Sequence, residues 1–356
     1  MRALVVNAGS TSLKVSLLDP PTTETFDTLA AALAGAGEID VVLHRVVHGG
    51  ERAQPALLDD EVVTELRALT ELAPLHQPPA LELIDRCRHA CPDVPQFACF
   101  DTSFHATVPR AARTYALPAR WRDRVVVYGF HGISHAWSAR RVGALAPGVR
   151  RLVVAHLGGG ASLCAVRDGR SVMTTMGFTP LDGLVMATRS GALDPGAVLW
   201  MAEHAHDGED IGRVLEHESG LLGLCGDADM RAVLTRCDAG DTDALLAVEV
   251  YVHRLVTAIG GCVAALGGLD GLAFTGGVGE HAPVVRELTA ARLEWLGVAL
   301  DDRTSAAPVR EITGEGAPVR TFVVEAREDL EMAEQVAPLL GEVSDPTATR
   351  PGAAPS

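Results

Sequence analysis

One short pattern occurs twice in this chain and restricts the fold more than any other feature. Residues 9–13 read GSTSL, and residues 159–163 read GGASL, 150 positions later. In each case an apolar run precedes the small residues and another follows, which is the pattern of a strand, a tight turn and a second strand. The repeat predicts a duplicated domain with a cleft between its two halves.

The rest of the chain alternates short β-branched runs with amphipathic segments, which indicates an α/β protein. Its 356 residues give room for two domains of ordinary size. We expect strands at 2–6, 13–18, 40–47, 95–100, 151–156, 161–167, 271–275 and 319–324. We expect helices at 60–72, 79–91, 134–146, 195–206, 228–237, 241–266, 283–295 and 328–340. The longest of these should be capped by Asp241 or Thr242 and end at Gly267 and Gly268.

Charge and composition exclude several classes of partner. The formal net charge of −16 argues against broad attraction to nucleic acid or to an anionic membrane, so we expect neither partner. Seven cysteines, with no CxxC pair, are typical of a reducing compartment. The uncharged run 255–269 is short for a membrane span and contains four glycines, which favours a buried helix. We expect the N-terminal residues to run directly into a strand, with no leader. We therefore expect a soluble, cytoplasmic protein whose Pro-, Ala- and Thr-rich tail, residues 341–356, is disordered.

Three glycine-rich or hydroxyl-rich turns follow apolar runs: VVNAGSTSLKVSLLD (5–19), AHLGGGAS (155–162) and FTGGVGEH (274–281). Small residues let backbone N–H groups approach a phosphate, and hydroxyl groups add donors. The first turn is not a Walker A loop, because Leu13 precedes the lysine and no helical period follows. Together the turns predict a nucleotide held between two domains, with two turns on the phosphates and the third near the nucleoside.

The first turn also contains Lys14, the only lysine among 30 basic residues. We interpret Lys14 as a compact ammonium that the hairpin delivers to the nucleotide phosphates, where a forked guanidinium would fit poorly. The alternative is a lysine that remains there by chance.

A series of longer motifs then gives a family resemblance. In order along the chain they are VVNAGSTSLKVSLLD (5–19), HRVVHGGE (44–51), LAPLHQPPAL (72–81), FDTSFH (100–105), YGFHGISH (128–135), HLGGGAS (156–162), MGFTPLDGLVMATRSG (176–191), SGLLGLCGDADMR (219–231), FTGGVGEHAPVVR (274–286) and EDLEMA (328–333). The series resembles acetate kinases over nearly the whole chain. The resemblance implies two RNase H-like domains of the actin and sugar-kinase type, with a nucleotide-binding cleft between them, and a homodimer. It implies an N-terminal domain of residues 1–101 closed by 329–340, and a second domain of 102–328.

The resemblance also implies a reaction: phosphoryl transfer from ATP to acetate, giving acetyl phosphate and ADP, with Mg²⁺ or alternatively Mn²⁺. A carboxylate is ionised at pH 7, so it needs no general base as a nucleophile. The difficulty is to bring two anions together, which calls for positioning and for cations at the phosphoryl group.

By resemblance, four residues carry the chemistry. Arg45 clamps the substrate carboxylate, Arg189 stabilises the phosphoryl group in flight, His131 contacts that group, and Asp101 is the essential acid near Mg²⁺. From the residues alone, alternatives remain open. Arg45 could form a structural ion pair, His131 could be a buried core histidine, and Asp101 could cap a turn.

Further residues match the family's binding positions. Asn7 and Glu328 match its metal site, where Asp329 could assist or could cap a helix with Glu328. His76 lines the site, and Val47, Leu75, Phe130 and Pro180 surround the acyl methyl. The phosphate contacts are Ser10, Ser12, Lys14, His156, Leu157, Gly158, Gly159 and Gly160. The adenosine contacts are Asp229, Met230, Arg231, Gly277, Val278, Gly279, Glu280 and His281.

The chain departs from the family at several points. It is shorter than a typical acetate kinase, with the loss before HRVVHGG, and it has Gly159 and Gln77 where Asn is usual. It has Met173 and Ala192 where Asp is usual. These changes put rate and nucleotide affinity in doubt more than the reaction type.

Two other functions compete with acetate phosphorylation. One is a propionate or butyrate kinase, because one methylene in an apolar pocket changes discrimination by only about 1–3 kcal/mol. The other is a non-catalytic, actin-like nucleotide-binding protein. Against it stands the intact set Arg45, Asp101, His131, Arg189 and Glu328.

Overall fold

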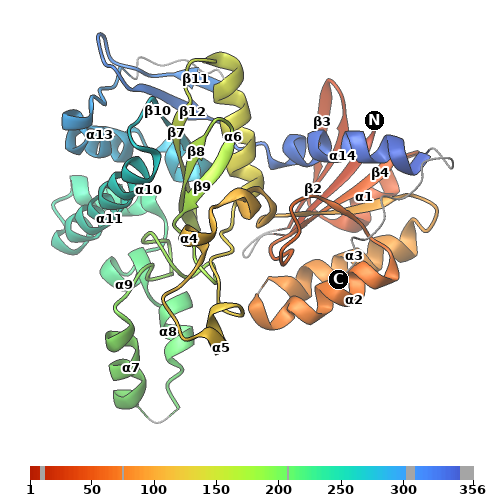
Figure 1. Cartoon of the computed structure of the whole chain (residues 1–356), viewed down its shortest axis with the longest axis horizontal. Helices are drawn as coiled ribbons and strands as arrows, with labels where there is room; N and C mark the ends of the chain where they lie inside the picture. Colours follow the sequence, from red (N-terminus) through yellow and green to blue (C-terminus); the bar gives the residue numbers. More distant parts are fainter. Residues whose placement is uncertain (9–12, 74–75, 207, 302–308, 345–356) are drawn as a thin grey trace. The chain divides into compact units, whose positions relative to one another are not determined.

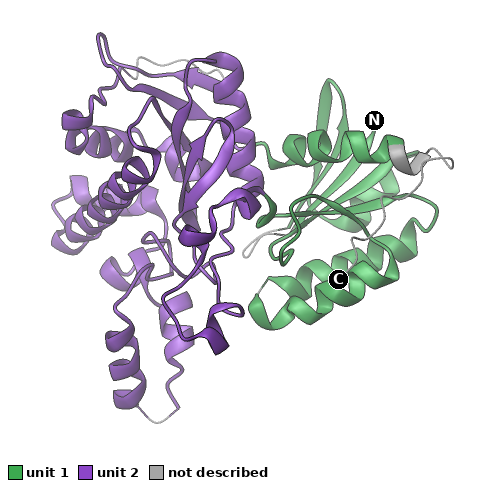
Figure 2. Cartoon of the chain, in the orientation of Figure 1, with its two compact units in different colours: residues 1–103, 327–356 green, residues 104–326 purple. Residues whose placement is uncertain are grey.

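The computed structural model describes residues 1–8, 13–73, 76–206, 208–301 and 309–344. The chain divides into two compact units, coloured separately in Figure 2. Unit 1 contains Met1–Ser103 and Arg327–Ser356, and unit 2 contains Phe104–Ala326. The expected domain boundaries were after residues 101 and 328. In the structure the chain passes from one unit to the other after residues 103 and 326.

Unit 1 is built on a six-stranded sheet with the order β3-β2-β1-β4-β6-β5. The strands β1, β2 and β3 are antiparallel neighbours, β4 and β6 run parallel to β1, and β5 is antiparallel to β6. Their bounds are β1 Ala3–Ala8, β2 Leu13–Asp19, β3 Thr22–Phe26, β4 Val41–Val46, β5 Ala56–Leu57 and β6 Gln96–Phe100. The helices are α1 Leu29–Gly35, α2 Asp60–Ala68, α3 Gln77–Ala90 and α14 Glu328–Ser344, with a 3₁₀ turn η1 at Leu69–Leu72.

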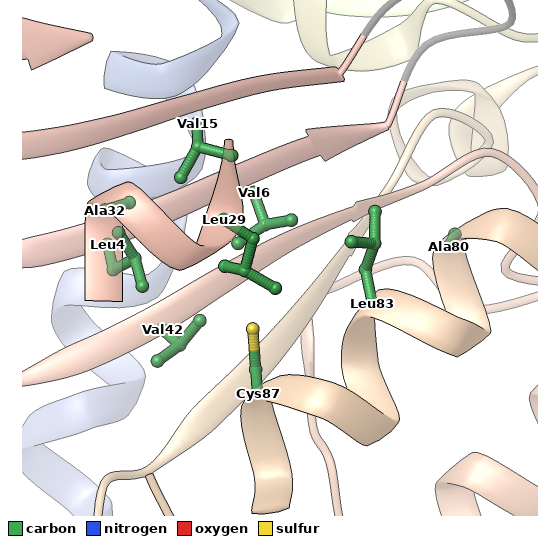
Figure 3. Close-up of a cluster of buried hydrophobic side chains, with 9 residues drawn as sticks. All are labelled: Leu4, Val6, Val15, Leu29, Ala32, Val42, Ala80, Leu83 and Cys87. Carbon is green, nitrogen blue, oxygen red and sulfur yellow. The ribbon is translucent and has the colours of Figure 1, made fainter. Parts of the chain in front are cut away.

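One face of this sheet forms the core shown in Figure 3. Side chains of β1, β2 and β4 pack there against α1 and α3, and the nine buried residues are Leu4, Val6, Val15, Leu29, Ala32, Val42, Ala80, Leu83 and Cys87. Even-numbered residues of β1 and β4 point into this core, so odd-numbered residues such as Asn7 and Arg45 point to the other face. The helix α14 contacts β1, β2 and β4 as well.

Unit 2 repeats the same strand topology. Its sheet order is β11-β12-β10-β7-β8-β9, with β7, β8 and β9 antiparallel, β10 and β12 parallel to β7, and β11 antiparallel to β12. The bounds are β7 Arg151–Leu157, β8 Ala161–Arg167, β9 Arg170–Thr174, β10 Gly271–Thr275, β11 Val309–Glu311 and β12 Arg320–Val324. Strand by strand, this is the arrangement of unit 1. The duplicated domain that the repeated turn predicted is therefore confirmed.

Two long helices of unit 2, α6 and α11, contact this sheet (Figure 1). The helix α6 contacts β7, β10 and β12, and the long helix α11 contacts β7, β8 and β9. The helices are α4 Arg110–Arg113, α5 Ala119–Arg122, α6 Gly132–Leu145, α7 Pro195–His204, α8 Ile211–His217, α9 Gly220–Cys225, α10 Met230–Asp238, α11 Thr242–Leu266, α12 Gly276–His281 and α13 Pro283–Arg292. Two 3₁₀ turns, η2 Ser103–Thr107 and η3 Glu294–Leu296, complete the set of elements in the described residues.

The helix α11 forms as its sequence predicts. The Asp241 side chain accepts hydrogen bonds from the N–H groups of Asp243 and Ala244, and Gly267 ends the helix in the left-handed region at φ 70°. By length and composition alone α11 could cross a membrane. Its buried residues recur every three or four positions, and the helix contacts β8, α9 and α10, which is typical of a core helix.

Several elements differ from the sequence prediction. The helix expected at 60–72 ends at Ala68 and continues as the 3₁₀ turn η1. The third glycine turn, expected at 274–281, is the short helix α12. The helix α14 continues to Ser344, so the expected disordered tail begins too early at residue 341, and its remainder, 345–356, lies outside the described residues.

Candidate functional site

Unit 1 gathers three predicted site residues around the guanidinium group of a fourth, Arg45. Arg45, near the end of β4, donates from Nε and Nη2 to the Asp101 carboxylate at 2.7–3.2 Å. Its Nη1 lies 3.1 Å from Asn7 Oδ1 and 3.2 Å from Glu328 Oε2. Asn7 in turn donates from Nδ2 to Glu328 Oε2 at 2.8 Å. Asp329 instead pairs with Arg327, at 2.7 Å.

The electrostatics of this Arg45 cluster follow from one cation facing two carboxylates. Burial disfavours the charged form of Arg45, but Asp101 and Glu328 outweigh it and raise the pKa of the guanidinium. Burial raises the pKa of Asp101 above its usual range, although Arg45 opposes this shift. The cluster therefore has an excess of negative charge that a further cation could neutralise.

The oxygen atoms of the Arg45 cluster suit Mg²⁺. Asn7, Asp101 and Glu328 offer one amide and two carboxylate groups, and Mg²⁺ prefers hard oxygen ligands while keeping several waters or phosphate oxygens. Within the described ranges, no group of three or more His, Cys, Asp or Glu residues is arranged to hold a metal ion alone.

Lys14 lies in the same row of the sheet as Asn7 and Arg45. It pairs with Asn7 in the antiparallel register of β1 and β2, and Asn7 pairs with Arg45 in the parallel register of β1 and β4. Directly opposite residues place their side chains on one face of a sheet. Lys14 is exposed there, while Ser10 and Ser12 lie outside the described residues.

The segment after β4 is held by Gln77. Its side chain is fully buried and bonds the backbone of His48 in both directions, at 3.4 Å to the N–H and 3.1 Å to the carbonyl. The neighbouring Val47 is 5% exposed. His76 is half-buried at the start of α3, and Leu75 lies outside the described residues. Gln77, which is longer than the family-typical Asn, thus holds the backbone at His48 through its side-chain amide.

In unit 2, His131 occupies a strained turn at the start of α6. It is one of two described non-glycine residues with positive φ, at 57°, a conformation that costs about 1–3 kcal/mol in most residues. Phe130 before it is buried, at 1% exposure. Such strain persists where the surroundings fix a residue for a purpose, so the turn is a candidate functional feature.

His131 meets Arg189 and His156 at the turn between β7 and β8. A Cβ on Gly160 would lie 3.2 Å from His131 Nε2 and 3.7 Å from Arg189 Nη1. The imidazole rings of His131 and His156 stack with centroids 4.4 Å apart. A side chain at residue 160 would crowd both groups, so glycine suits this close approach. The predicted residues His131, His156, Gly160 and Arg189 are therefore brought together.

The loop that carries Arg189 is tied to the same turn. The N–H of Ala187 donates to the carbonyl of Gly159 at 3.0 Å, and the N–H of Ser219 donates to Thr188 at 3.0 Å. Burial lowers the pKa of Arg189, with Glu216 opposing, so its guanidinium is partly removed from water. Because water does not fully solvate this charge, an incoming anion would gain more from it.

Further polar residues that the sequence did not single out surround this turn. Ser162 Oγ lies 3.0 Å from His131 Nδ1 and 2.8 Å from His135 Nε2, and Ser134 Oγ lies 2.8 Å from His156 Nδ1. His105 bonds the carbonyl of Phe130 at 3.0 Å. The sequence HGISH placed His135 one helical turn after His131, which was the available signal.

The residues predicted to contact adenosine differ in how exposed their side chains are. Asp229 caps α10 and pairs with the exposed Arg231, whereas the Met230 side chain is buried at 3% exposure and so belongs to the packing of α10. In α12, Gly277 faces open space, and His281 is 76% exposed. Val278 and Gly279 lie in the middle of this helix.

Glu280 has a different environment from the other residues of α12. Its Oε1 accepts hydrogen bonds from the N–H of Gly276 at 2.9 Å and from the N–H of Ala326 at 3.0 Å. The side chain is 12% exposed. The carboxylate thus joins the start of α12 to the last residue of unit 2.

Two predicted residues contribute little through their own side chains. Leu157 is fully buried at the end of β7, so only its backbone could reach a ligand. Pro180 is half-buried in a loop in which the N–H of Gly183 donates to Asp182 Oδ1.

Comparisons with known proteins identify the family. The Acetokinase family matches residues 23–334. An acetate kinase of Streptomyces coelicolor is 45% identical over 322 residues, covering 88% of this chain and 79% of that protein. An acetate kinase of Kocuria rhizophila is 41% identical, covering 96% of this chain and 85% of that protein.

Solved structures give the same result. A propionate kinase from Francisella tularensis has a TM-score of 0.86 at 32% identity, covering 94% of this chain and 98% of that one. The acetate kinase of Porphyromonas gingivalis has a TM-score of 0.86 at 29% identity, covering 95% of this chain and 99% of that one. The resemblance drawn from the sequence motifs is confirmed.

Proposed function

The chain belongs to the Acetokinase family, and we propose that it catalyses reversible, Mg²⁺-dependent phosphoryl transfer from ATP to acetate, giving acetyl phosphate and ADP by direct in-line transfer. The observation that carries the proposal is the approach of His131 and Arg189 to Gly160. A planar cation and an N–H donor beside a glycine turn suit the three equatorial oxygens of a phosphoryl group in transfer.

We assign each unit its own part in this chemistry. In unit 2, Arg189 stabilises negative charge on the transferring group, His131 donates a hydrogen bond to it, and the turn Gly158–Gly160 with His156 binds phosphate oxygens. In unit 1, Arg45 binds the acetate carboxylate, and Asp101 and Glu328 orient its guanidinium. Lys14 adds a positive charge for the nucleotide phosphates.

Asn7, Asp101 and Glu328 would hold Mg²⁺, in part through water. When bound, the ion would neutralise charge on the phosphate oxygens. Because acetate is already ionised at pH 7, no residue has to remove a proton from it.

Propionate phosphorylation is a second activity with specific support. The Francisella tularensis structure, which is similar over 94% of this chain, is a propionate kinase. Val47 and Phe130 are apolar and buried, as expected for an acyl pocket. One additional methylene should cost about 1–3 kcal/mol in discrimination.

We also propose a homodimer and a cytoplasmic location. The helix α7 has no buried side chain, and Leu199 and Trp200 on it are 66% and 60% exposed, which supports a contact with a second copy. All seven cysteines are free, which supports a reducing compartment. Light scattering of the purified protein tests the homodimer, and Trp200→Glu is the variant expected to weaken it.

The central experiment is a hydroxamate trap for acyl phosphate with ATP and Mg²⁺, run with acetate, propionate and butyrate. We expect acyl hydroxamate with acetate, less with propionate, and none after chelation of Mg²⁺. Product with propionate but not acetate would select the second activity. No product with any acid would overturn the proposal and favour a non-catalytic nucleotide-binding protein.

A further inference from the structure

Three side chains of unit 2 form a continuous hydrogen-bonded chain behind the candidate site. His131 is the N-cap of α6, His135 lies in the first turn of that helix, and Ser162 lies on β8. Ser162 Oγ bonds His131 Nδ1 at 3.0 Å and His135 Nε2 at 2.8 Å. Ser162 and His135 are both fully buried.

The direction of these two bonds can be decided from the hydroxyl group. Within the described residues, Ser162 Oγ is hydrogen-bonded to these two imidazoles alone. A serine hydroxyl has one proton, so it donates to one ring and accepts from the other. His135 is neutral, because burial holds its pKa well below the ordinary value, and so it has one N–H to place.

The other nitrogen of His135 settles the choice. His135 Nδ1 is buried and has no hydrogen-bond partner among the described residues. If Ser162 donated to His135 Nε2, the ring proton would sit on Nδ1 as a buried N–H without an acceptor, which proteins rarely tolerate. In the opposite direction, His135 Nε2–H donates to Ser162, and Ser162 donates to His131 Nδ1.

We propose that Ser162 and His135 are positioning residues that hold His131 in its Nε2–H tautomer, as a neutral hydrogen-bond donor directed at the Gly160 turn. His131 Nε2 is the nitrogen on that side, 3.2 Å from the position of a Cβ on Gly160. The inference rests on the proposed function, in which this nitrogen contacts the transferring phosphoryl group. It explains how His131 donates a hydrogen bond there without first being protonated.

A second serine–histidine pair in the same unit has the same polarity. His105 Nε2 lies 3.0 Å from the carbonyl oxygen of Phe130, which can only accept, so the ring proton is on Nε2. Ser171 Oγ, 2.9 Å from His105 Nδ1, must then donate to it. Serine donation to Nδ1 therefore occurs on both sides of the Phe130–His131 turn.

The tautomer can be measured directly by NMR on the full chain labelled with ¹⁵N-histidine. Long-range ¹H–¹⁵N spectra distinguish an acceptor nitrogen from an N–H nitrogen in each ring, and His131→Gln assigns the signals by their loss. We expect His131 of the wild type to show an acceptor Nδ1 and an N–H at Nε2. An N–H at Nδ1, in the neutral ring, would overturn the proposal without any variant.

Ser162→Ala removes the donor, and Ser138→Ala is its control. Ser138 is a buried serine on α6 whose hydroxyl has no hydrogen-bond partner among the described residues. We expect Ser162→Ala to shift His131 towards the Nδ1–H tautomer and to lower kcat about tenfold, with both KM values nearly unchanged. Ser138→Ala should change neither readout. An unchanged tautomer and kcat in folded Ser162→Ala would refute the positioning role.

The NMR readout separates this inference from the proposed function. If wild-type protein forms no acyl phosphate but His131 has the Nε2–H tautomer, and Ser162→Ala alters it, the proposed function fails and the positioning role stands. If the wild type is active and the tautomer is reversed, the positioning role fails alone.

Discussion

At the scale of single residues, the two glycines that end the β7–β8 turn make opposite demands on a side chain. A Cβ on Gly159 meets no atom within 4 Å, while a Cβ on Gly160 would lie 3.2 Å from His131. We therefore expect Gly159→Asn, which restores the family-typical residue, to keep activity equal or higher. Gly160→Ala should lower kcat about tenfold or more, because His131 must move.

Steady-state kinetics of both glycine variants, with melting temperatures as the folding control, checks this pair. Equal losses in the two variants would mean that the whole turn, and not the His131 side of it, limits activity.

A second residue-scale prediction concerns Arg45, whose guanidinium contacts Asp101 with two nitrogens and Asn7 and Glu328 with the third. Arg45→Ala would leave the buried Asp101 carboxylate without its cation, at a cost of about 3–5 kcal/mol, so a loss of activity in this variant would not separate binding from folding. Arg45→Lys keeps the charge but loses the fork. It should raise the KM for acetate at least tenfold and the KM for ATP much less.

The control for Arg45→Lys is Arg52→Lys, in an exposed pair with Glu65 in the same unit. Its kinetics should match the wild type. Equal rises in both KM values for Arg45→Lys would contradict its assignment to the acetate carboxylate.

At the scale of elements, the sequence predicted those whose apolar pattern is strong and missed those formed by tertiary context. The strands β1, β4 and β7 are apolar on both faces and were found. The strand β3, Thr22–Phe26, is exposed and polar, so its alternation carried no signal. The segment that forms α12 contains three glycines, which predicted a turn. The sequence spacing did not indicate the hydrogen bond from the Gly276 N–H to the Glu280 side chain.

The same limit applies to the candidate site. Arg45, Asp101, His131 and Arg189 follow from local motifs. The contact between Ser162 and His131, 31 residues apart, depends on tertiary packing, which no local pattern specifies.

Glu280 provides the prediction for the element α12. Its carboxylate accepts from two backbone N–H groups, Gly276 at one end of the helix and Ala326 beyond β12. Charge-assisted hydrogen bonds contribute about 1.5–3 kcal/mol each. Glu280→Ala should therefore lower the free energy of unfolding by about 2–4 kcal/mol, as measured by urea unfolding.

The exposed Glu287, on the neighbouring helix α13, is the matched control, and Glu287→Ala should stay within about 0.5 kcal/mol of the wild type. Trp137 is a convenient fluorescent reporter, because its Nε1 donates to the carbonyl of Glu325 next to Ala326. If the two glutamate variants are equally stable, the carboxylate does not tie α12 to this segment.

At the scale of the whole molecule, buried histidines in both units link folding to pH. Burial lowers the pKa of His44 and of His48 in unit 1 to about 4, with Gln96 partly opposing at His44. It lowers the pKa of His105 in unit 2 to about 4, and the pKa of His135 falls well below its ordinary value. The unfolded chain therefore binds protons at these sites at a higher pH than the folded chain does.

The sign of the effect follows from that difference. Above pH 6.5, the ordinary value, these histidines are neutral in both states, and the stability is fully present. As the pH falls from 6.5 towards 4, the unfolded chain binds protons that the folded chain does not bind, and the free energy of unfolding decreases. Each such histidine contributes a slope of up to about 1.4 kcal/mol per pH unit, so four of them make the chain markedly acid-sensitive.

The last prediction isolates one of these histidines. His44→Gln keeps a side-chain N–H near Gln96 Oε1, which His44 Nε2 contacts at 2.9 Å, but cannot be protonated. Between pH 7 and 5.5, the variant should lose stability less steeply than the wild type, by up to about 1.4 kcal/mol per pH unit. Urea unfolding at a series of pH values measures this slope. The exposed His253→Gln is the control and should leave the slope unchanged. If the two variants have the same slope, His44 is not a source of the acid sensitivity.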